Sequence, residues 1–335
     1  MVNSAMAQAG ETRAHGGDLD RAVARFGGSR AEWIDLSTGI NPHAWPLQQA
    51  LQAMPGSVWQ ALPDRHAQDR LLDAARRAYG LHPSNDIVAA PGTQALIQLM
   101  PRLASGSRVA VRHPSYNEHR GVFADAGWQL TAEPPADTVV RVNPNNPDGH
   151  RTSTDELTDL AARVGTLIVD EAFMDMTEEE SLCRHALPGN VVVLRSFGKF
   201  FGLAGLRLGF AVGAPETTHR LNRLLGPWAV AGPTLHLGAA ALNDHQWIAE
   251  MKQRLSRDTS RLREMLRAAG LDQLTGTDLF QTGGTPDAPA LHEALARAHI
   301  WTRIFDGWPG HIRFGLPASD MAFARLEQAL PKGTT

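Results

Sequence analysis

The sequence predicts an α/β fold, in which a mainly parallel β-sheet lies between helices and a smaller α+β domain follows. Between residues 86 and 213, short apolar runs alternate with segments of helical length. Two of these runs, TLIVD and VVVLR, are rich in β-branched residues, as strands buried on both faces are. After about residue 270 the order becomes strand, helix, strand, strand and helix, which indicates a separate unit.

The first elements are expected to be a helix over 18–26, an extended piece over 32–37, and helices over 47–54 and 66–79. In the alternating part, the predicted strands are 86–90, 108–111, 138–142, 166–170, 191–195 and 208–213. The helices expected between them are 92–104, 115–126 and 154–164. The start of the last helix, STDE at 153–156, has the spacing of a capping box.

The C-terminal third begins with an amphipathic helical stretch at 233–270, in which Leu255, Leu262 and Leu266 share one face. The rest is predicted to form a strand from about 275, a helix at 290–298, strands at 299–304 and 311–316, and a helix at 319–330.

Composition narrows the class of protein. The chain has 335 residues, is 43% hydrophobic and 20% charged, and has a net charge of −3, so no basic field indicates nucleic acid. No apolar run is long enough to cross a membrane, and residues 1–14 lack the pattern of a secretory signal. The single cysteine, Cys183, excludes an intrachain disulfide and a thiolate metal cluster. We therefore expect a cytoplasmic protein without a metal site.

One lysine stands in an unusual setting. The segment SFGKFFGLAGLRLGF, at 196–210, places Lys199 beside Phe197, Phe200 and Phe201. The chain has only three lysines among its 32 basic residues, so arginine carries nearly all the positive charge. A buried lysine loses its proton readily and then acts as a nucleophile. The alternative is an amine that reaches the surface from an apolar strand end, and this segment alone does not separate the two.

Other candidate side chains follow the ends of the predicted strands, where ligands bind in open parallel sheets. Each alone is also explained by an ordinary turn or by packing. They are an anion site at a helix start (Gly92, Thr93 and Gln94), an aromatic ring (Tyr116), an amide (Asn146), a buried carboxylate (Asp170), and a second pair of anion ligands (Ser196 and Arg207).

Together with Lys199, these groups match the needs of one cofactor, pyridoxal 5′-phosphate. This cofactor requires a lysine for a Schiff base and an acid on its pyridine nitrogen. It also requires a phosphate site and a face for its ring. The dinucleotide, triphosphate and zinc-protease signatures GxGxxG, GxxxxGK[ST] and HExxH are absent from the sequence.

The order of these motifs resembles the fold-type-I aminotransferase superfamily over nearly the whole chain. Within it, the chain is most similar to the threonine-phosphate decarboxylase branch, which serves cobalamin biosynthesis. The segments that carry this closer resemblance are HGGDLDRAVARFGG (15–28), WIDLSTGINP (33–42), VDEAFMD (169–175), LRSFGKFFGLAGLRLGF (194–210) and GPW (226–228).

The resemblance implies a large domain with a mainly parallel seven-stranded sheet and specific residue roles. Lys199 would bind the cofactor covalently, Asp170 would pair with its ring nitrogen, and Tyr116 would stack on its ring. Asn146 would bond the ring's 3′-oxygen, and the phosphate would be held by Gly92, Thr93, Gln94, Ser196 and Arg207. Arg313 would grip the substrate carboxylate, His15 and Arg303 would lie near a substrate phosphate, and Gly39 would belong to a segment that closes over the substrate.

Two positions depart from the superfamily pattern. Phe173 stands where a tyrosine often bonds the 3′-oxygen, and phenylalanine is also what the decarboxylase branch tends to show. Leu62 stands where a tyrosine usually reaches the neighbouring subunit's cofactor phosphate. Loss of one charge-assisted hydrogen bond is expected to weaken cofactor binding by about 1.5–3 kcal/mol unless another group substitutes.

By resemblance, the chain is expected to decarboxylate L-threonine O-3-phosphate. The alternatives are an aminotransferase, such as histidinol-phosphate aminotransferase, and a non-catalytic scaffold for a cobinamide-forming synthase. The expected partners are a phosphorylated amino acid, a second copy of the chain that completes the site, and that synthase. The domain division is an N-terminal arm at 1–45, a cofactor domain at 46–230, and a linking helix with a small domain at 231–335.

Overall fold

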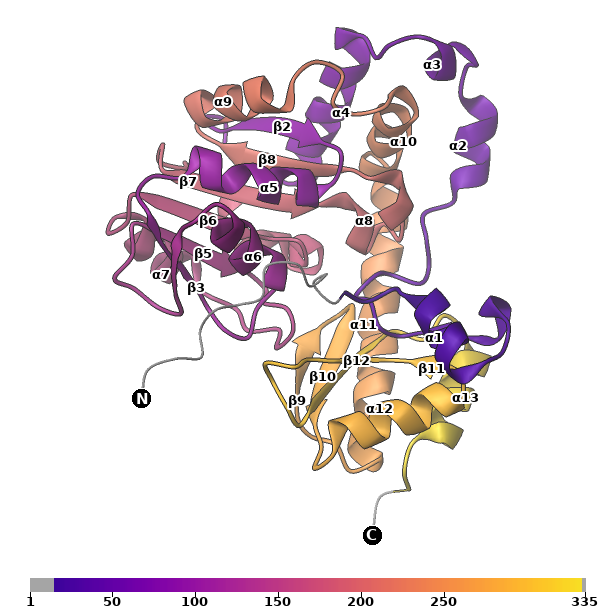
Figure 1. Ribbon diagram of the computed structural model, residues 1–335. Helices are drawn as coiled ribbons and strands as arrows, with labels where there is room; N and C mark the ends of the chain where they lie inside the picture. Colours follow the sequence, from indigo (N-terminus) through magenta and orange to yellow (C-terminus); the bar gives the residue numbers. More distant parts are fainter. Residues whose placement is uncertain (1–14, 333–335) are drawn as a thin grey trace.

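The computed structural model describes residues 15–332, which form a large and a small domain joined by one long helix (Figure 1). The large domain is built on a seven-stranded sheet in the order β2-β8-β7-β6-β5-β3-β4. All its strands are parallel except β8, which runs antiparallel to both of its neighbours. The strands are β2 Asp86–Ala90, β3 Arg108–Val111, β4 Gln129–Thr131, β5 Thr138–Val142, β6 Thr166–Asp170, β7 Val191–Ser196 and β8 Gly209–Gly213.

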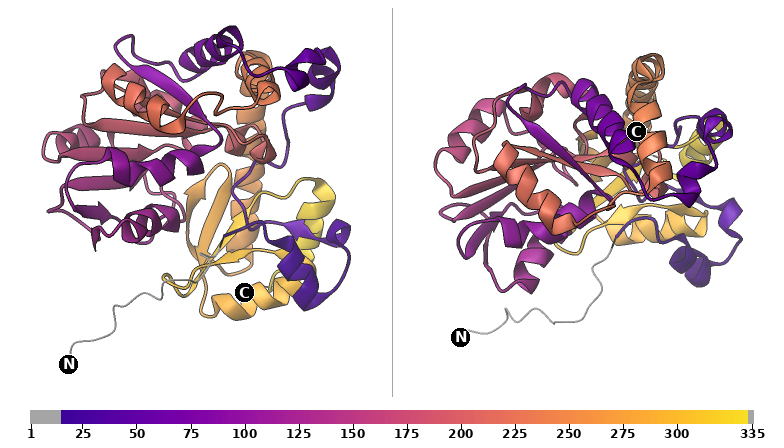
Figure 2. Two further views of the ribbon diagram at one scale, coloured as in Figure 1. Left: turned by 45° about the horizontal axis from the view of Figure 1, so that its top comes forward. Right: turned by 90° about the horizontal axis from the view of Figure 1, so that it is seen from above.

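Helices cover both faces of this sheet (Figure 2). They are α4 Arg65–Ala78, α5 Thr93–Leu103, α6 Asn117–Asp125, α7 Thr154–Ala161, α8 Phe197–Phe200, α9 Pro215–Leu225 and α10 Gly232–Leu242. In β6, Leu167 and Val169 belong to the core shared with α4, α7 and α10, whereas Ile168 belongs to the core shared with α5 and α6. Because alternate residues of a strand point to opposite faces, a run buried on both faces is apolar throughout.

The small domain holds a four-stranded antiparallel sheet in the order β12-β13-β10-β9. Its elements are β9 Asp272–Thr277, β10 Phe280–Gly284, α12 Ala288–Arg297, β11 Ile300–Trp301, β12 Arg303–Ile304, β13 His311–Gly315 and α13 Asp320–Ala329. The 24-residue helix α11, His245–Ala268, connects it to the large domain. Leu255, Leu262 and Leu266 are all buried, which confirms the predicted apolar face of this helix.

The N-terminal segment packs on the small domain. Its helix α1, Leu19–Phe26, contributes Leu19 and Ala22 to a separate apolar cluster that includes Ala296 of α12. Strand β1, Ile34–Asp35, then pairs in parallel with β11. The chain returns to the large domain through α2, Leu47–Ala53, and α3, Ser57–Gln60. The expected arm at 1–45 thus crosses from one domain to the other, and its residues 1–14 lie outside the described part.

Several predicted bounds need correction. The stretch 233–270 is two helices, because Asp244 caps the start of α11 by accepting a hydrogen bond from the backbone N–H of Trp247. The strand expected from 275 is a hairpin of β9 and β10. The strand expected at 299–304 divides at Thr302 between two sheets, and its hydroxyl lies 2.8 Å from Nδ1 of His292.

Helices α3, α8 and α9 and the three-residue edge strand β4 escaped prediction. The elements α3, α8 and β4 are too short to show an apolar period, whereas α9 is amphipathic and carries a signal that the prediction missed. Among residues 15–332, no helix is both long and apolar enough to cross a membrane.

Candidate active site

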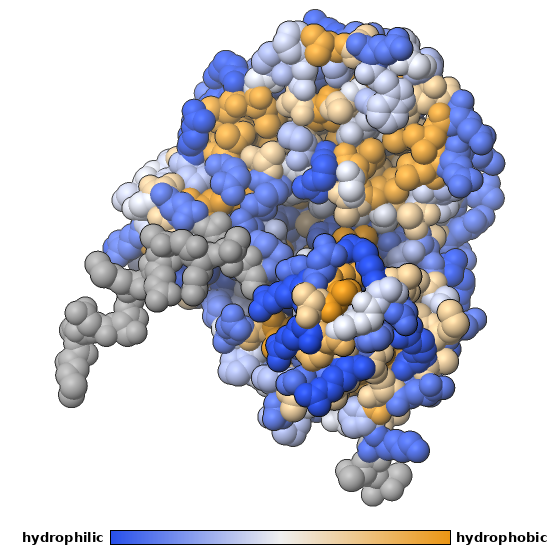
Figure 3. All heavy atoms as spheres, turned by 45° about the vertical axis from the view of Figure 1, so that its right-hand side comes forward, coloured by the Kyte–Doolittle hydropathy of each residue, from blue (hydrophilic) through white to orange (hydrophobic). Residues whose placement is uncertain are grey.

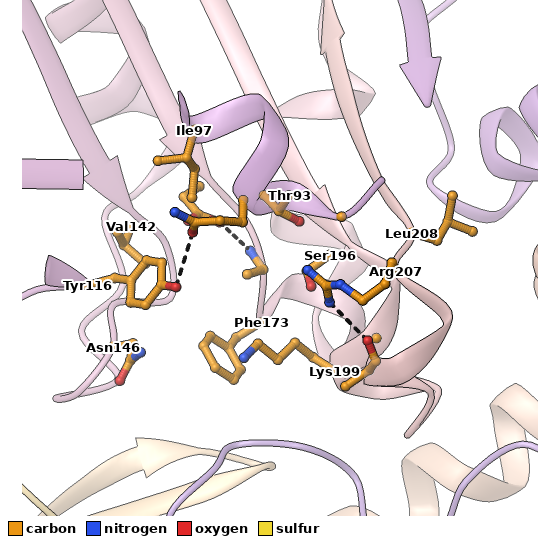
Figure 4. A pocket seen from close by; sticks show the side chains of 16 residues that line it. Thr93, Ile97, Tyr116, Val142, Asn146, Phe173, Ser196, Lys199, Arg207 and Leu208 are labelled. Carbon is orange, nitrogen blue, oxygen red and sulfur yellow. Dashed lines mark hydrogen bonds between the residues drawn. The ribbon is translucent and has the colours of Figure 1, made fainter. Parts of the chain in front are cut away.

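One cavity at the carboxyl ends of the parallel strands brings the predicted cofactor residues together (Figure 4). All nine residues named from the sequence line it: Gly92, Thr93, Gln94, Tyr116, Asn146, Asp170, Ser196, Lys199 and Arg207. They come from five different strand ends, which explains why they are scattered in the sequence. This is the place where open α/β sheets bind their ligands.

Lys199 lies in the short helix α8, directly after β7, and its amine points into the cavity toward the ring of Phe173. The Nζ atom lies 5.2 Å from the centroid of that ring. Burial, followed by the nearby Arg313 guanidinium, lowers the pKa of Lys199 to about 8. The three phenylalanines around Lys199 are themselves buried, with the rings of Phe197 and Phe201 stacked at 4.4 Å. The fold therefore provides an amine that is readily neutral and nucleophilic.

A cradle for an anion forms where α5 begins. Gly92, the residue before the helix, has a φ of +85°, and a Cβ there would lie 2.6 Å from a guanidinium nitrogen of Arg207. Arg207 is itself held by a hydrogen bond of 2.9 Å from its Nη1 to the carbonyl oxygen of Ala204. The helix N-terminus and this guanidinium thus face the same space, and both favour a phosphate.

Asp170 ends β6 and is 2% exposed. One of its oxygens lies 2.8 Å from Nε2 of His119, and the other accepts a hydrogen bond from the backbone N–H of Ala172. His119 is fully buried, and its Nδ1 has no hydrogen-bond partner within residues 15–332. Sequence reasoning missed His119, although its position three residues after Tyr116 on a short helix places it on the cavity side.

The predicted substrate residues line an adjoining cavity, which shares Tyr116, Asn146, Lys199 and Arg207 with the first. It contains His15, Gly39, Arg303 and Arg313. A Cβ at Gly39 would lie 2.8 Å from the ring of Phe173, so this backbone must pass close to the cofactor site.

Arg313 is the most enclosed cation of the adjoining cavity. Its Nη2 donates to the carbonyl oxygen of Ser37 at 2.6 Å, and its Nη1 donates to Oδ1 of Asn146. Burial, followed by the charge of Arg303, lowers the pKa of Arg313 to about 9. Because the oxygen of Asn146 accepts from Arg313, the amide nitrogen remains as the donor that the sequence predicts for this residue.

A second charged cluster holds the loop that follows Asp170. Arg195 of β7 is fully buried, pairs with Glu178, and has Glu171 and Asp175 at 3.5 and 3.6 Å. Burial raises the pKa of Glu171 to about 7, although Arg195 opposes the shift. Ser181 and the backbone of Leu182 donate to the same carboxylate. This network fixes the chain between Asp170 and η4, Leu182–Arg184, behind the cavity.

The described part of the chain offers no set of side chains that could hold a metal ion. Within residues 15–332, no group of three or more histidine, cysteine, aspartate or glutamate side chains is placed to hold a metal ion.

The chain is similar to known proteins over most of its length. The model of the aminotransferase class I and II family matches residues 31–325, and the chain belongs to this family. The chain is 42% identical to threonine-phosphate decarboxylases of Pseudomonas aeruginosa and of a Sinorhizobium species. The first alignment covers 94% of this chain and 96% of the relative, and the second covers 95% and 97%.

More distant relatives share the fold. A histidinol-phosphate aminotransferase of Syntrophotalea carbinolica is 30% identical over 82% of this chain and 84% of its own. The solved structure of histidinol-phosphate aminotransferase from Sinorhizobium meliloti, in complex with pyridoxal 5′-phosphate, matches with a TM-score of 0.82 at 20% identity and covers 98% of both chains. This last likeness concerns the fold alone.

As a member of this family the chain is an enzyme that uses pyridoxal 5′-phosphate. The cavity fits this cofactor. Its amine has a lowered pKa, its anion cradle would be filled by a single added Cβ, and its buried carboxylate is already paired with a histidine.

Proposed function

We propose that the enzyme decarboxylates L-threonine O-3-phosphate to (R)-1-amino-2-propanol O-2-phosphate, which supplies the aminopropanol part of cobalamin. The observation that carries the proposal is a pair of separate cationic positions next to Lys199. Arg313 lies deep in the adjoining cavity. His15 and Arg303 form a second position on its wall, where Nη1 of Arg303 donates to the backbone carbonyl oxygen of His15. A phosphorylated amino acid has two anionic groups that fit two such positions. The names of the relatives at 42% identity support the same reaction.

The residues of the chain would act mainly by orientation. Arg313 would hold the substrate carboxylate, and His15 with Arg303 would hold the phosphate, so that the Cα–carboxylate bond is fixed relative to the cofactor. The bound cofactor supplies the electron sink for that bond. Phe173 and Phe280, whose rings meet at 5.1 Å, exclude water beside the Lys199 amine. With a pKa of about 8, Lys199 Nζ is suited to return a proton to Cα near neutral pH.

The test is the release of carbon dioxide from O-phospho-L-threonine, with free L-threonine as the control. We expect a kcat/KM at least about 10-fold higher for the phosphorylated substrate, because the loss of one charge-assisted contact corresponds to a factor of about 10–150. Equal values for the two substrates would contradict recognition through the phosphate.

An aminotransferase is the second candidate, favoured by the 30% identity to histidinol-phosphate aminotransferase. The same residues can serve both reactions. The reactions differ in which bond of the substrate Cα the residues around the substrate align with the cofactor. Incubation with an amino donor and then a keto acid, followed by the absorbance change of the pyridoxamine form, separates the two reactions.

The proposal includes a homodimer. Apolar surface gathers on the large-domain part of one face (Figure 3). Three large hydrophobic side chains of the large domain, Trp59, Leu62 and Trp228, are at least 60% exposed. A cytoplasmic location and an interaction with a cobinamide-forming synthase belong to the same proposal. Cys183, the only cysteine of the sequence, is buried and free, which suits a reducing compartment.

A further inference from the structure

A buried carboxylate that the predicted mechanism does not use lies at the edge of the two cavities. Glu118, the second residue of α6, is 5% exposed. Its Oε2 accepts a hydrogen bond of 2.7 Å from Nε2 of Gln94, and its Oε1 lies 3.1 Å from Nε2 of His15. Burying a negative charge beside two anion sites costs free energy unless neighbouring groups form hydrogen bonds or ion pairs with it. The contacts of Glu118 with Gln94 and His15 therefore indicate its role.

The imidazole of His15 is held between the two domains. Its ring contacts Glu118 of the large domain, and its backbone carbonyl accepts from Nη1 of Arg303 in β12 at 3.2 Å. The His15 side chain is 47% exposed and lines the outer cavity together with Arg303 and Arg313. The contact with Glu118 occupies Nε2, so Nδ1 is the ring nitrogen that remains for a ligand.

The contact with Glu118 determines which ring nitrogen is left for a ligand. With Nε2 of His15 3.1 Å from Oε1 of Glu118, Nδ1 lies on the other side of the ring. A histidine that donates from both ring nitrogens can bridge a carboxylate and a phosphate oxygen. The pair of Glu118 and His15 thus leaves Nδ1 as the ring atom for a phosphate in the cavity.

We propose that Glu118 is a positioning residue that orients His15 for the phosphate of the substrate. This inference rests on the proposed function and adds a residue to its phosphate recognition.

The alternative is a purely structural role. Through Gln94, Glu118 also contacts the cofactor side, because the hydroxyl of Tyr116 donates to Oε1 of Gln94 at 3.3 Å. If Glu118 only supports Gln94 and Tyr116, its replacement would affect the reaction of every substrate and the absorbance of the bound cofactor. A residue that acts through His15 would affect the phosphate alone.

The test compares the holoenzyme with its Glu118→Gln, His15→Gln and double variants. We expect Glu118→Gln to raise KM for O-phospho-L-threonine and the inhibition constant of inorganic phosphate about 10- to 100-fold, with kcat changed less than about threefold. Kinetic constants for free L-threonine and the cofactor absorbance should stay as in the wild type. His15→Gln alters a half-exposed side chain, so it tests the same contact without disturbing the core. The double variant should lose no more than either single variant.

Glu156→Gln, an exposed carboxylate in the first turn of α7, is the matched control and should leave all these constants unchanged. Equal losses with both substrates, an altered cofactor absorbance, or additive effects in the double variant would overturn the inference. A wild-type enzyme that releases carbon dioxide from O-phospho-L-threonine while Glu118→Gln keeps its KM would refute the role of Glu118 alone. A wild type without that activity would refute the proposed function, and this inference with it.

Discussion

At the scale of single residues, the environment of Lys199 answers why an amine lies among aromatic rings. The rings of Phe197, Phe200 and Phe201 pack into the core, and only Phe173 faces the amine. The Lys199 amine lies in a buried environment of low polarity, near the cations of Arg313 and Arg207. Both effects disfavour the ammonium form, so the site stabilises the neutral nucleophile that covalent chemistry requires.

This environment predicts how the reactivity of Lys199 depends on pH. Below its pKa of about 8 the amine is protonated, so its neutral fraction rises about tenfold per pH unit and levels off above pH 8. At pH 7 this fraction is more than about 100-fold that of an ordinary lysine, whose pKa is about 10.4. Competitive reductive methylation of the cofactor-free enzyme, read by mass spectrometry, measures the midpoint at Lys199 against the exposed Lys332. A midpoint above pH 10 would contradict the lowered pKa.

His119 provides the second prediction at this scale. It contacts Asp170 at 2.8 Å and holds that carboxylate in place. His119→Leu removes the hydrogen bond, which corresponds to about 1.5–3 kcal/mol and thus to a fall in kcat of about 10- to 150-fold. The pH titration of the cofactor absorbance should shift as well. His119→Gln retains a donor and should recover part of the loss, and a leucine variant with wild-type kcat and absorbance would show that Asp170 needs no such support.

At the scale of elements, the start of α5 carries the third prediction. Gly92 combines a φ of +85° with a guanidinium where a Cβ would lie. Gly92→Ala therefore strains the backbone and displaces Arg207, at a cost of about 1–3 kcal/mol. We expect cofactor affinity to fall about 5- to 150-fold, measured by fluorescence titration of the cofactor-free enzyme.

Gly127 is the matched control for this change. Its φ is +78°, but apart from its chain neighbours no atom of residues 15–332 lies within 4 Å of where its Cβ would stand. Gly127→Ala should thus show the backbone cost in thermal unfolding while cofactor affinity stays unchanged. If both variants lost affinity equally, the close approach of Arg207 would play no part.

The elements also show which features a sequence can predict. The strands of the large sheet were predictable because burial on both faces leaves continuous apolar runs such as TLIVD. The meeting of the nine predicted cofactor residues in one cavity was predictable because each stands at or after the carboxyl end of such a strand. His119 and Glu118 were missed because they lie inside α6, where a polar residue usually faces water, and only the packing of that helix turns them toward the site. The hairpin of β9 and β10 was missed because its turn carries no distinctive residue pattern.

At the scale of the whole molecule, the substrate cavity exists only where the two domains meet. Arg303 of the small domain holds the backbone of His15, and His113 of the large domain lies 3.0 Å from the carbonyl oxygen of Gly307. Thr282 of β10 donates to the carbonyl oxygen of Pro147 at 2.6 Å. These contacts hold Arg303 and Arg313 of the small domain in one cavity with Lys199 of the large domain. The sequence does not specify this placement locally, since the pairs are up to 288 residues apart.

The apolar face of the large domain leads to the last prediction. Trp59 and Leu62 lie in and just after α3. Gly232, the first residue of α10, packs closely against Val58 of α3. Burial of each large side chain in an interface contributes about 1.5–3 kcal/mol, and a two-fold symmetric interface counts each one twice. Trp59→Glu combined with Leu62→Glu should therefore weaken the dimer at least about 100-fold. Sedimentation should show the 36.3 kDa chain alone at micromolar concentration, and activity should be lost if the partner completes the site.

Met321→Glu, on the exposed side of α13 in the small domain, should leave the dimer intact, because it removes a side chain that is 73% exposed on a different surface. A double variant that sediments as the wild type does would place the interface elsewhere.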